Sequence, residues 1–116
     1  MKNNQKQQLA VVWASGDVEV AEKVCLMYTH NASLQWWFDE VVLIVWGPSA
    51  KLLSENVILQ EKVTKMIADG VKLEACRACA NMYGVSDQLS ALGIEVKGMG
   101  SVLSNYLKEG WKVLTF

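Results

Sequence analysis

Residues 41–46 read Val41-Val-Leu-Ile-Val-Trp46, an unbroken apolar run without a charged side chain. A second run of the same kind, Leu9-Ala-Val-Val-Trp-Ala14, precedes it. Continuous runs of this length, rich in Val and Ile, are typical of strands buried on both faces, as in a parallel sheet. Three further segments, 71–75, 94–96 and 112–116, alternate apolar and polar residues, which predicts strands with one wetter face.

Helical patterns separate these five segments. Asp17 can cap a helix that reaches about residue 34. Residues 55–68 repeat apolar side chains at helical spacing, and Gly70 ends the pattern. Three shorter helices are expected after Ala75, Ser86 and Ser101. This alternation predicts an α/β fold with three layers, in which a mostly parallel sheet of about five strands carries helices on both faces.

The chain has 116 residues, which fits one domain: we expect a flexible tail over residues 1–8 and a single domain over 9–116. Eleven basic and 12 acidic side chains leave a net charge of −1, which argues against binding to nucleic acid or to an anionic membrane. No apolar run approaches the ~20 residues of a membrane span. Three cysteines are an odd number and do not suggest a secreted disulfide framework, so we expect a cytoplasmic protein.

The strongest candidates for chemical reactivity are Cys76 and Cys79, in a Cys-Arg-Ala-Cys sequence between the third predicted strand and a helix. In a parallel sheet this is the edge where ligands and chemistry collect. The helix dipole and the nearby Arg77 would favour a thiolate there. The spacing also puts both sulfur atoms on one side of the first helical turn. The alternative without chemistry is two small side chains buried in helix packing.

Several kinds of cysteine site are possible from the residues alone. A thioredoxin-like redox centre is disfavoured, because no Trp or Pro flanks the pair in the usual way. A zinc site needs about four ligands, and the other candidates, Cys25 and His30, share one predicted helix at non-facing positions, so we expect no metal and no cofactor. A thiol that carries sulfur as a persulfide needs only one accessible cysteine, and it fits best.

Two loops should lie beside this pair and form the wall of a binding site. Ser15 and Gly16 follow the first strand, and Trp46, Gly47, Pro48 and Ser49 follow the second. Their backbone N–H groups could hold an anion, although ordinary turns and helix caps are the alternative.

The remaining candidates have structural interpretations. Cys25 is expected to be a buried small hydrophobe, and His30 a surface residue that interacts with the end of its helix rather than a catalytic base. The carboxylates are interpreted as solvated charges, with no acid–base pair among them. The cluster Trp36-Trp37-Phe38 is hard to bury in so small a domain and predicts a subunit interface.

The sequence resembles the DsrE-like family of small sulfur-relay proteins. The resemblance is carried by Val11-Val-Trp-Ala-Ser-Gly-Asp17, by Val45-Trp-Gly-Pro-Ser-Ala-Lys51 and above all by Gly70-Val-Lys-Leu-Glu-Ala-Cys-Arg-Ala-Cys-Ala-Asn-Met-Tyr-Gly-Val85. It implies a three-layer α/β/α domain assembled into trimers or hexamers, with possible sister subunits. In the family's sulfur carriers one cysteine precedes a Gly-Val pair, and here Cys76 precedes Gly84-Val85.

We therefore expect a sulfur carrier or sulfurtransferase-like protein that accepts sulfane sulfur on Cys76 and passes it to a partner thiol, with Cys79 as a resolving thiol or second carrier. Ser15, Gly16, Trp46, Gly47, Pro48, Ser49 and Arg77 are the expected binding residues. Donor and acceptor proteins or small persulfides would be its partners. Two alternatives stay open: a non-catalytic oligomeric protein that binds a small ligand, and a thiol redox regulator that uses Cys76 and Cys79.

Overall fold

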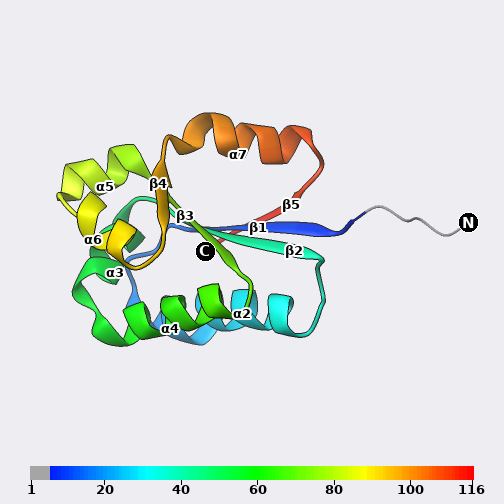
Figure 1. Cartoon of the computed structure of the whole chain (residues 1–116), viewed down its shortest axis with the longest axis horizontal. Coiled ribbons are helices and arrows are strands. Elements are labelled where there is room, and N and C mark those ends of the chain that lie inside the picture. The colour runs from blue at the N-terminus through cyan, green and yellow to red at the C-terminus, as the bar shows by residue number, and fades with distance from the viewer. Residues whose placement is uncertain (1–5) are drawn as a thin grey trace, which may run out of the picture.

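The computed structural model describes residues 6–116 and contains a five-stranded sheet between two layers of helices (Figure 1). The strand order is β4-β3-β2-β1-β5, and every neighbouring pair is parallel. The fold class expected from the sequence is thereby confirmed. The strands are β1 (Gln8–Trp13), β2 (Glu40–Val45), β3 (Lys72–Cys76), β4 (Glu95–Lys97) and β5 (Lys112–Thr115). The helices are α1 (Val18–Val20), the π-helical turn η1 (Ala21–Cys25), α2 (Leu26–Leu34), α3 (Pro48–Glu55), α4 (Val57–Ala68), α5 (Arg77–Tyr83), α6 (Ser86–Ala91) and α7 (Met99–Lys108).

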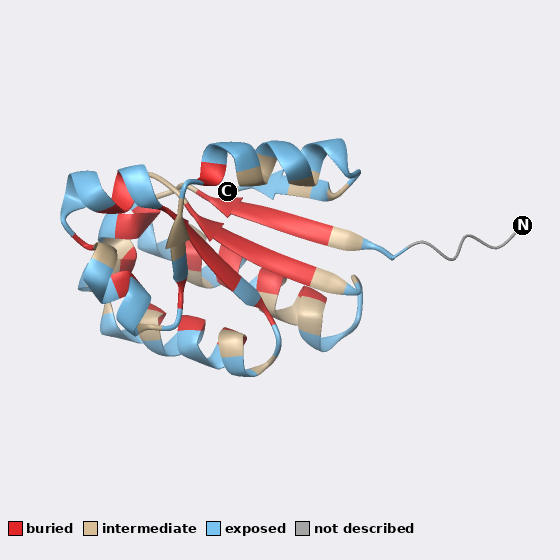
Figure 2. Ribbon diagram, turned by 45° about the horizontal axis from the view of Figure 1, so that its top comes forward, coloured by how far each residue is buried: buried red, intermediate tan, exposed pale blue. Residues whose placement is uncertain are grey.

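The two long apolar runs form the centre of the sheet. In β1 and β2 all residues after the first are buried, as the continuous red ribbons of Figure 2 show. Their register pairs Leu9 with Val41 and Trp13 with Val45. Both runs are apolar throughout because helices cover both faces of these strands.

The two helical layers differ in extent. One face of the sheet packs against η1, α2, α3, α4, α5 and α6 in a large apolar core. The other face packs mainly against α7, in a smaller cluster that includes Val12, Ile44 and Met99 (Figure 1). That smaller cluster also contains Cys76 and Cys79, so the candidate thiols lie on the thinly covered side of the sheet.

The helices differ from the sequence expectation in two places. Asp17 caps the first helix as expected, since its carboxylate accepts the N–H groups of Glu19 and Val20, but a π-helical turn interrupts the run to Leu34. The loop expected after the second strand is shorter than predicted, because Pro48 already begins a helix, α3, that runs to Glu55. Pro48 stands in its first turn, where the fixed φ of proline suits a helix and its missing N–H costs nothing.

The chain enters the sheet at Gln8, and the backbone N–H of Gln7 donates to the Asp39 carboxylate at 2.8 Å. Residues 1–5 of the expected tail lie outside the described residues, and its flexibility stays a prediction. Within residues 6–116, none of the helices combines the length and apolar character needed to cross a bilayer.

Candidate functional site

The cysteine pair, Cys76 and Cys79, lies where the third strand meets a helix. Cys76 is the last residue of β3 and the N-cap residue of α5, and Cys79 lies one turn into α5. Their side chains are 7% and 8% exposed. Both pack in the apolar cluster beneath α7, next to Met99 and Trp46. The pair is therefore at the carboxyl edge of the sheet, as expected, but almost entirely covered.

The two thiols contact one another. Burial raises the pKa of the Cys79 thiol, its hydrogen bond with Cys76 raises that pKa further, and a hydrogen bond from the Gly47 backbone acts in the opposite direction. Burial and the contact with Cys76 therefore both favour the protonated form of the Cys79 thiol. A thiolate on Cys76 would have a hydrogen-bond donor within the same helical turn.

The loops after β1 and β2 meet beside this pair. A Cβ built on Gly16 would lie 3.2 Å from the Cβ of Pro48, so the two loops touch at a position where a side chain would crowd them. Gly47 has φ +71° and ψ −137°, a backbone region that glycine occupies far more readily than other residues. This conformation accompanies the hydrogen bond from Gly47 to Cys79.

The other three expected binding residues are engaged with the protein itself. The Ser49 hydroxyl is buried, donates to the Trp13 carbonyl oxygen and accepts the Trp46 N–H. The Ser15 hydroxyl accepts the Asp17 N–H at 3.0 Å. The exposed Arg77 guanidinium donates to the carbonyl oxygen of Val96 at 3.1 Å. Ser49 thus ties the ends of β1 and β2 together, and ligand binding by these side chains stays a prediction.

The helix that carries Cys79 is short and ends at a glycine. Gly84 adopts the left-handed conformation (φ +70°, ψ 32°), and its N–H bonds back to Ala80. The last turn before it exposes Met82 (78%) and Tyr83. An apolar rim of this kind next to a covered thiol is a surface that a protein partner could contact.

Sequence reasoning missed a charged cluster beside the cysteines. The sequence predicts that the carboxylates are solvated charges, and for Glu74 this prediction is wrong, because its side chain is 0% exposed. Its carboxylate accepts the Tyr106 hydroxyl at 2.7 Å and pairs with the ammonium groups of Lys97 at 2.7 Å and Lys72 at 3.3 Å. We call these four residues the Glu74 network. Alternation along β3 puts Glu74 on the same face as Cys76, a signal that the sequence does contain.

The Glu74 network keeps its charges. Burial alone would raise the pKa of the Glu74 carboxyl, but hydrogen bonds from Lys97 and Tyr106 and the charges of Lys97 and Lys72 outweigh it, so that pKa is lowered. The hydrogen bond to Glu74 raises the pKa of Lys97 against partial burial. Burial, together with Glu74, raises the pKa of Tyr106 far above its ordinary value. The carboxylate and the ammonium are both charged at neutral pH, and Tyr106 remains a hydrogen-bond donor.

Cys25 and His30 lie apart from the cysteine pair. Cys25 is fully buried in the large core, as expected, and burial raises its pKa to about 12. His30 does not interact with the end of its own helix but bonds to the Asp69 carboxylate at 2.7 Å, at the end of α4. That hydrogen bond lowers the pKa of Asp69. Among residues 6–116, no three His, Cys, Asp or Glu side chains gather as metal ligands.

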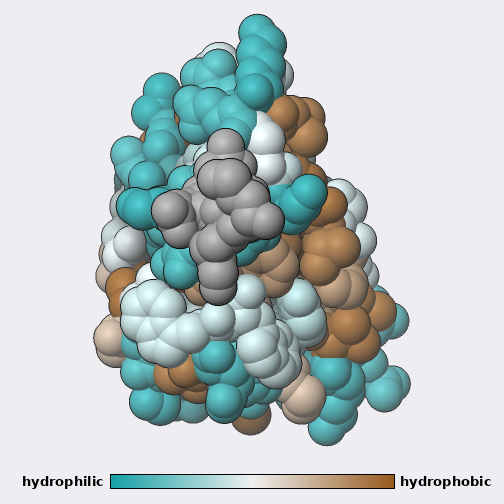
Figure 3. Space-filling model, turned by 90° about the vertical axis from the view of Figure 1, so that its right-hand side faces the viewer, coloured by the Kyte–Doolittle hydropathy of each residue, from teal (hydrophilic) through white to brown (hydrophobic). Residues whose placement is uncertain are grey.

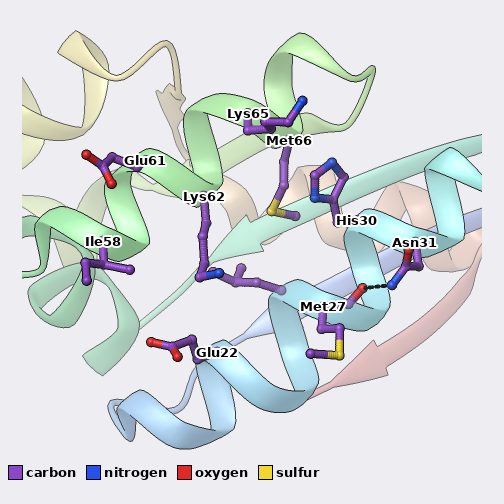
Figure 4. Close-up of a pocket in the computed structure, with 10 residues that line it drawn as sticks. Glu22, Met27, His30, Asn31, Ile58, Glu61, Lys62, Lys65 and Met66 are labelled. Carbon is purple, nitrogen blue, oxygen red and sulfur yellow. Dashed lines mark hydrogen bonds between the residues drawn. The ribbon is translucent and has the colours of Figure 1, made fainter.

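A pocket of about 420 Å³ opens between α2 and α4, on the sheet face opposite the cysteine pair. Figure 4 shows Lys62 of α4 reaching across toward the facing helix, with Glu22, Met27 and His30 on the other side. None of the expected site residues lines it. The pocket and the thiols are therefore separate features.

Two members of the aromatic cluster, Trp36 and Trp37, are exposed, whereas Phe38 is partly buried against the large core. Trp36 is 76% exposed and has φ +55°, and Trp37 is also exposed, with its ring 5.7 Å from that of Tyr28. Figure 3 views the end of the molecule at which β1 and β2 begin, where apolar side chains gather along one side. Other exposed apolar residues are Val24, Met27 and Leu114. So many exposed large apolar side chains on a small domain are typical of a protein–protein contact.

Comparisons with known proteins agree with this architecture. A model of the DsrE/DsrF-like family matches residues 19–116. The chain is similar to the solved structure of BT1422, a conserved protein of unknown function from Bacteroides thetaiotaomicron, with 31% identity, a TM-score of 0.91 and 95% of each chain covered. The ychN protein of E. coli (18% identity, TM-score 0.75) and MTH1491 of Methanobacterium thermoautotrophicum (17%, 0.76) share the fold over 95% of this chain and 99% of theirs. No curated protein matches the sequence.

Proposed function

Since this chain belongs to the DsrE/DsrF-like family, we propose that it is a sulfur carrier that accepts sulfane sulfur on Cys76 and passes it to the thiol of a partner. The observation that carries the proposal is the position of Cys76 at the end of β3, as the N-cap residue of α5, in hydrogen-bond contact with a second thiol. Backbone N–H groups at a helix start stabilise a sulfur anion.

The reaction has two balanced steps. The Cys76 thiolate attacks the outer sulfur of a donor persulfide, R–S–SH; a bond forms between the two sulfur atoms, the donor's S–S bond breaks, and R–S⁻ leaves. An acceptor thiolate then attacks the outer sulfur of Cys76–S–SH, takes it as a new persulfide and releases the Cys76 thiolate. No oxidant is consumed, because the sulfane sulfur keeps its oxidation state throughout.

The surroundings of Cys76 support this chemistry in a specific way. Cys79 supplies a hydrogen-bond donor to the Cys76 sulfur, and Gly47 directs a backbone N–H at the neighbouring sulfur atom. Cys79 could also receive the outer sulfur when no partner is bound. The low exposure of both side chains means that transfer needs a small opening of the loops around Gly16 and Pro48, of α5 or of α7.

A partner chain is part of the proposal. We propose that this protein forms a homo-oligomer, a trimer or hexamer, with possible sister subunits, through the exposed side chains of Trp36 and Trp37, and that it works in the cytoplasm, where thiols stay reduced. Analytical ultracentrifugation of the wild type and of Trp37→Ala tests the assembly. We expect the variant to sediment as a species of lower mass than the wild-type oligomer, and a monomeric wild type would contradict the proposal.

A second candidate is a thiol redox regulator, favoured by the contact between Cys76 and Cys79. In this alternative a two-electron oxidant, such as a peroxide, converts the two thiols into one disulfide. The reaction removes two hydrogens from the protein and requires both cysteines equally.

Intact-protein mass spectrometry distinguishes the candidates. The wild type, Cys76→Ser and Cys79→Ser are each incubated with a polysulfide donor and then with a reductant. If the protein is a sulfur carrier, its mass increases by about 32 Da after incubation with the donor, and the reductant removes this increase. The increase should be absent only in Cys76→Ser. A loss of two hydrogens that needs both cysteines supports the redox regulator. No change in any protein contradicts both thiol functions and leaves the ligand-binding alternative.

A further inference from the structure

Helix α7 covers the face of the sheet on which Cys76 and Cys79 lie (Figure 1). Both thiols share one apolar cluster with Met99, the first residue of this helix. Leu103 and Tyr106, from later turns of α7, pack against the same cluster. The docked helix therefore contributes to the low exposure of both thiols.

Few buried side chains hold α7 on the sheet. Only Met99 is buried among its ten residues, whereas α4 on the opposite face buries Leu59, Val63 and Met66. The sequence of α7 contains Gly, Ser and Asn, which are weak helix formers, and no side chain within residues 6–116 caps its start. A segment with so few buried apolar contacts opens locally at a low cost in free energy.

One polar contact ties the second half of α7 to the sheet. The Tyr106 hydroxyl donates to the Glu74 carboxylate at 2.7 Å, and it is the one side-chain hydrogen bond between α7 and the sheet in the described part of the chain. Beside it the ring of Trp111 lies 4.5 Å from that of Tyr106, and the buried indole N–H of Trp111 has no hydrogen-bond partner within residues 6–116. Opening would hydrate this N–H, which offsets part of the cost of breaking the Tyr106 bond.

Glycines stand at both ends of α7. Gly98 precedes the helix, and Gly110, with φ +86°, follows it. A Cβ on either glycine would meet no atom of a non-neighbouring residue within 4 Å. The backbone at both ends can therefore change direction without a clash, as hinges require.

The other elements around the thiols are held more firmly. Helix α5 buries Ala80 in the large core, and α3 buries Leu53 there. The Ser49 hydroxyl ties the ends of β1 and β2 together, and Gly16 packs closely against Pro48. Opening of α7 is therefore the least costly way to uncover the cysteine pair.

We propose that α7 is a lid whose transient undocking exposes Cys76 and Cys79, and that the hydrogen bond from Tyr106 to Glu74 is its latch. This inference rests on the function proposed above, since a covered thiol must be exposed before it can exchange sulfur with a partner. The open lid admits the donor or the acceptor on the α7 side of the sheet. The closed lid shields a persulfide on Cys76 from other thiols.

Alkylation by iodoacetamide, followed for each cysteine by peptide mass spectrometry, tests the lid in the wild type. At low reagent concentration each rate reports the population of the open form. We expect the rates of Cys76 and Cys79 to be nearly independent of urea at low urea, because undocking one helix exposes little surface. Cys25, buried in the opposite core, should react only on global unfolding, at a rate that rises steeply with urea. An equal urea dependence of all three cysteines would overturn the proposal.

Tyr106→Phe tests the latch in the same urea range. The alkylation rates of Cys76 and Cys79 should both rise about 30-fold, the factor expected for the loss of a hydrogen bond to a charged group. An equal factor at both thiols identifies one common opening. Ser86→Ala is the matched control: it removes a 2.6 Å hydrogen bond to Asn81 between α6 and α5, and it should leave both rates unchanged. No acceleration in Tyr106→Phe, acceleration of one thiol alone, or an equal acceleration in Ser86→Ala would overturn the proposal.

The alkylation assay contains no sulfur donor, so its result is separate from that of sulfur loading. Protein that loads sulfur on Cys76 but alkylates Cys76 with the urea dependence of Cys25 contradicts the lid alone. Protein that shows the two urea dependences but never gains sulfur contradicts the sulfur carrier alone.

Discussion

Removal of the Tyr106 hydroxyl tests whether the buried charge of Glu74 depends on it. Tyr106→Phe removes a 2.7 Å hydrogen bond to a carboxylate that has no exposed surface, and keeps the ring that packs 4.5 Å from Trp111. A hydrogen bond to a charged group contributes about 1.5–3 kcal/mol, and we expect a loss of about 2 kcal/mol because Tyr106 is itself only half-buried. With a urea dependence of about 2 kcal/mol per molar, the unfolding midpoint falls by about 1 M.

Urea unfolding at neutral pH, followed by tryptophan fluorescence, measures this loss. Tyr83→Phe is the control, because Tyr83 is exposed and its hydroxyl makes no hydrogen bond within residues 6–116; its midpoint should stay at the wild-type value. If Tyr106→Phe were no less stable than Tyr83→Phe, the hydroxyl would not support the buried carboxylate, and the reasoning on the Glu74 network would be refuted.

Three further predictions follow from the same geometry. The pKa of Glu74 is lowered in the folded state, so ionised Glu74 contributes its full stabilisation above pH 4.5, the ordinary pKa of a glutamate. That stabilisation is lost as the pH falls through the lower pKa of the folded state. Urea titrations at decreasing pH should therefore show a smaller loss of stability in Glu74→Gln than in the wild type, and an equal loss would contradict the lowered pKa. Cys25, fully buried with a pKa of about 12, should resist iodoacetamide at about pH 8 until urea unfolds the protein, and labelling of native protein at Cys25 would show that its burial is wrong. Gly47→Ala should cost about 1–3 kcal/mol because of its φ of +71°, whereas Gly98→Ala, at φ −65° with open space, should cost much less in the same unfolding assay; equal costs would argue against strain at Gly47.

The fold was predictable because its central strands are buried on both faces. The runs around residues 9–14 and 41–46 are apolar throughout, a pattern that few structures other than a parallel sheet require. The helix α3 was missed because Gly47 and Pro48 resemble a turn, and whether Pro48 ends a turn or begins a helix depends on the packing of the residues after it. The π-helical turn η1 is not predictable for a similar reason. It covers only Ala21–Cys25, and a change of hydrogen bonding over one turn is too short to alter the spacing of apolar residues along the helix.

The sequence predicts where the candidate site lies in the fold, but not the side-chain contacts within it. The strand-to-helix junction at Cys76 follows from the order of the elements, and the neighbouring loops after β1 and β2 follow from a parallel sheet. The Glu74 network was not foreseen, because a single glutamate in an alternating strand is usually solvated. Its burial depends on Tyr106, 32 residues away, and on Lys97 in the neighbouring strand, contacts that no local pattern encodes.

The central claim is that Cys76 passes sulfur on rather than merely binding it, and a single-turnover transfer tests that most directly. Protein loaded from a donor enriched in a heavy sulfur isotope is freed of donor and mixed with a small-molecule thiol acceptor. We predict that the label leaves the peptide carrying Cys76 at the rate at which it appears as acceptor persulfide, one sulfur for one, and that Cys76→Ser never carries it. Label that loads equally on Cys76→Ser, or that stays on the protein while the acceptor remains unmodified, would contradict the account.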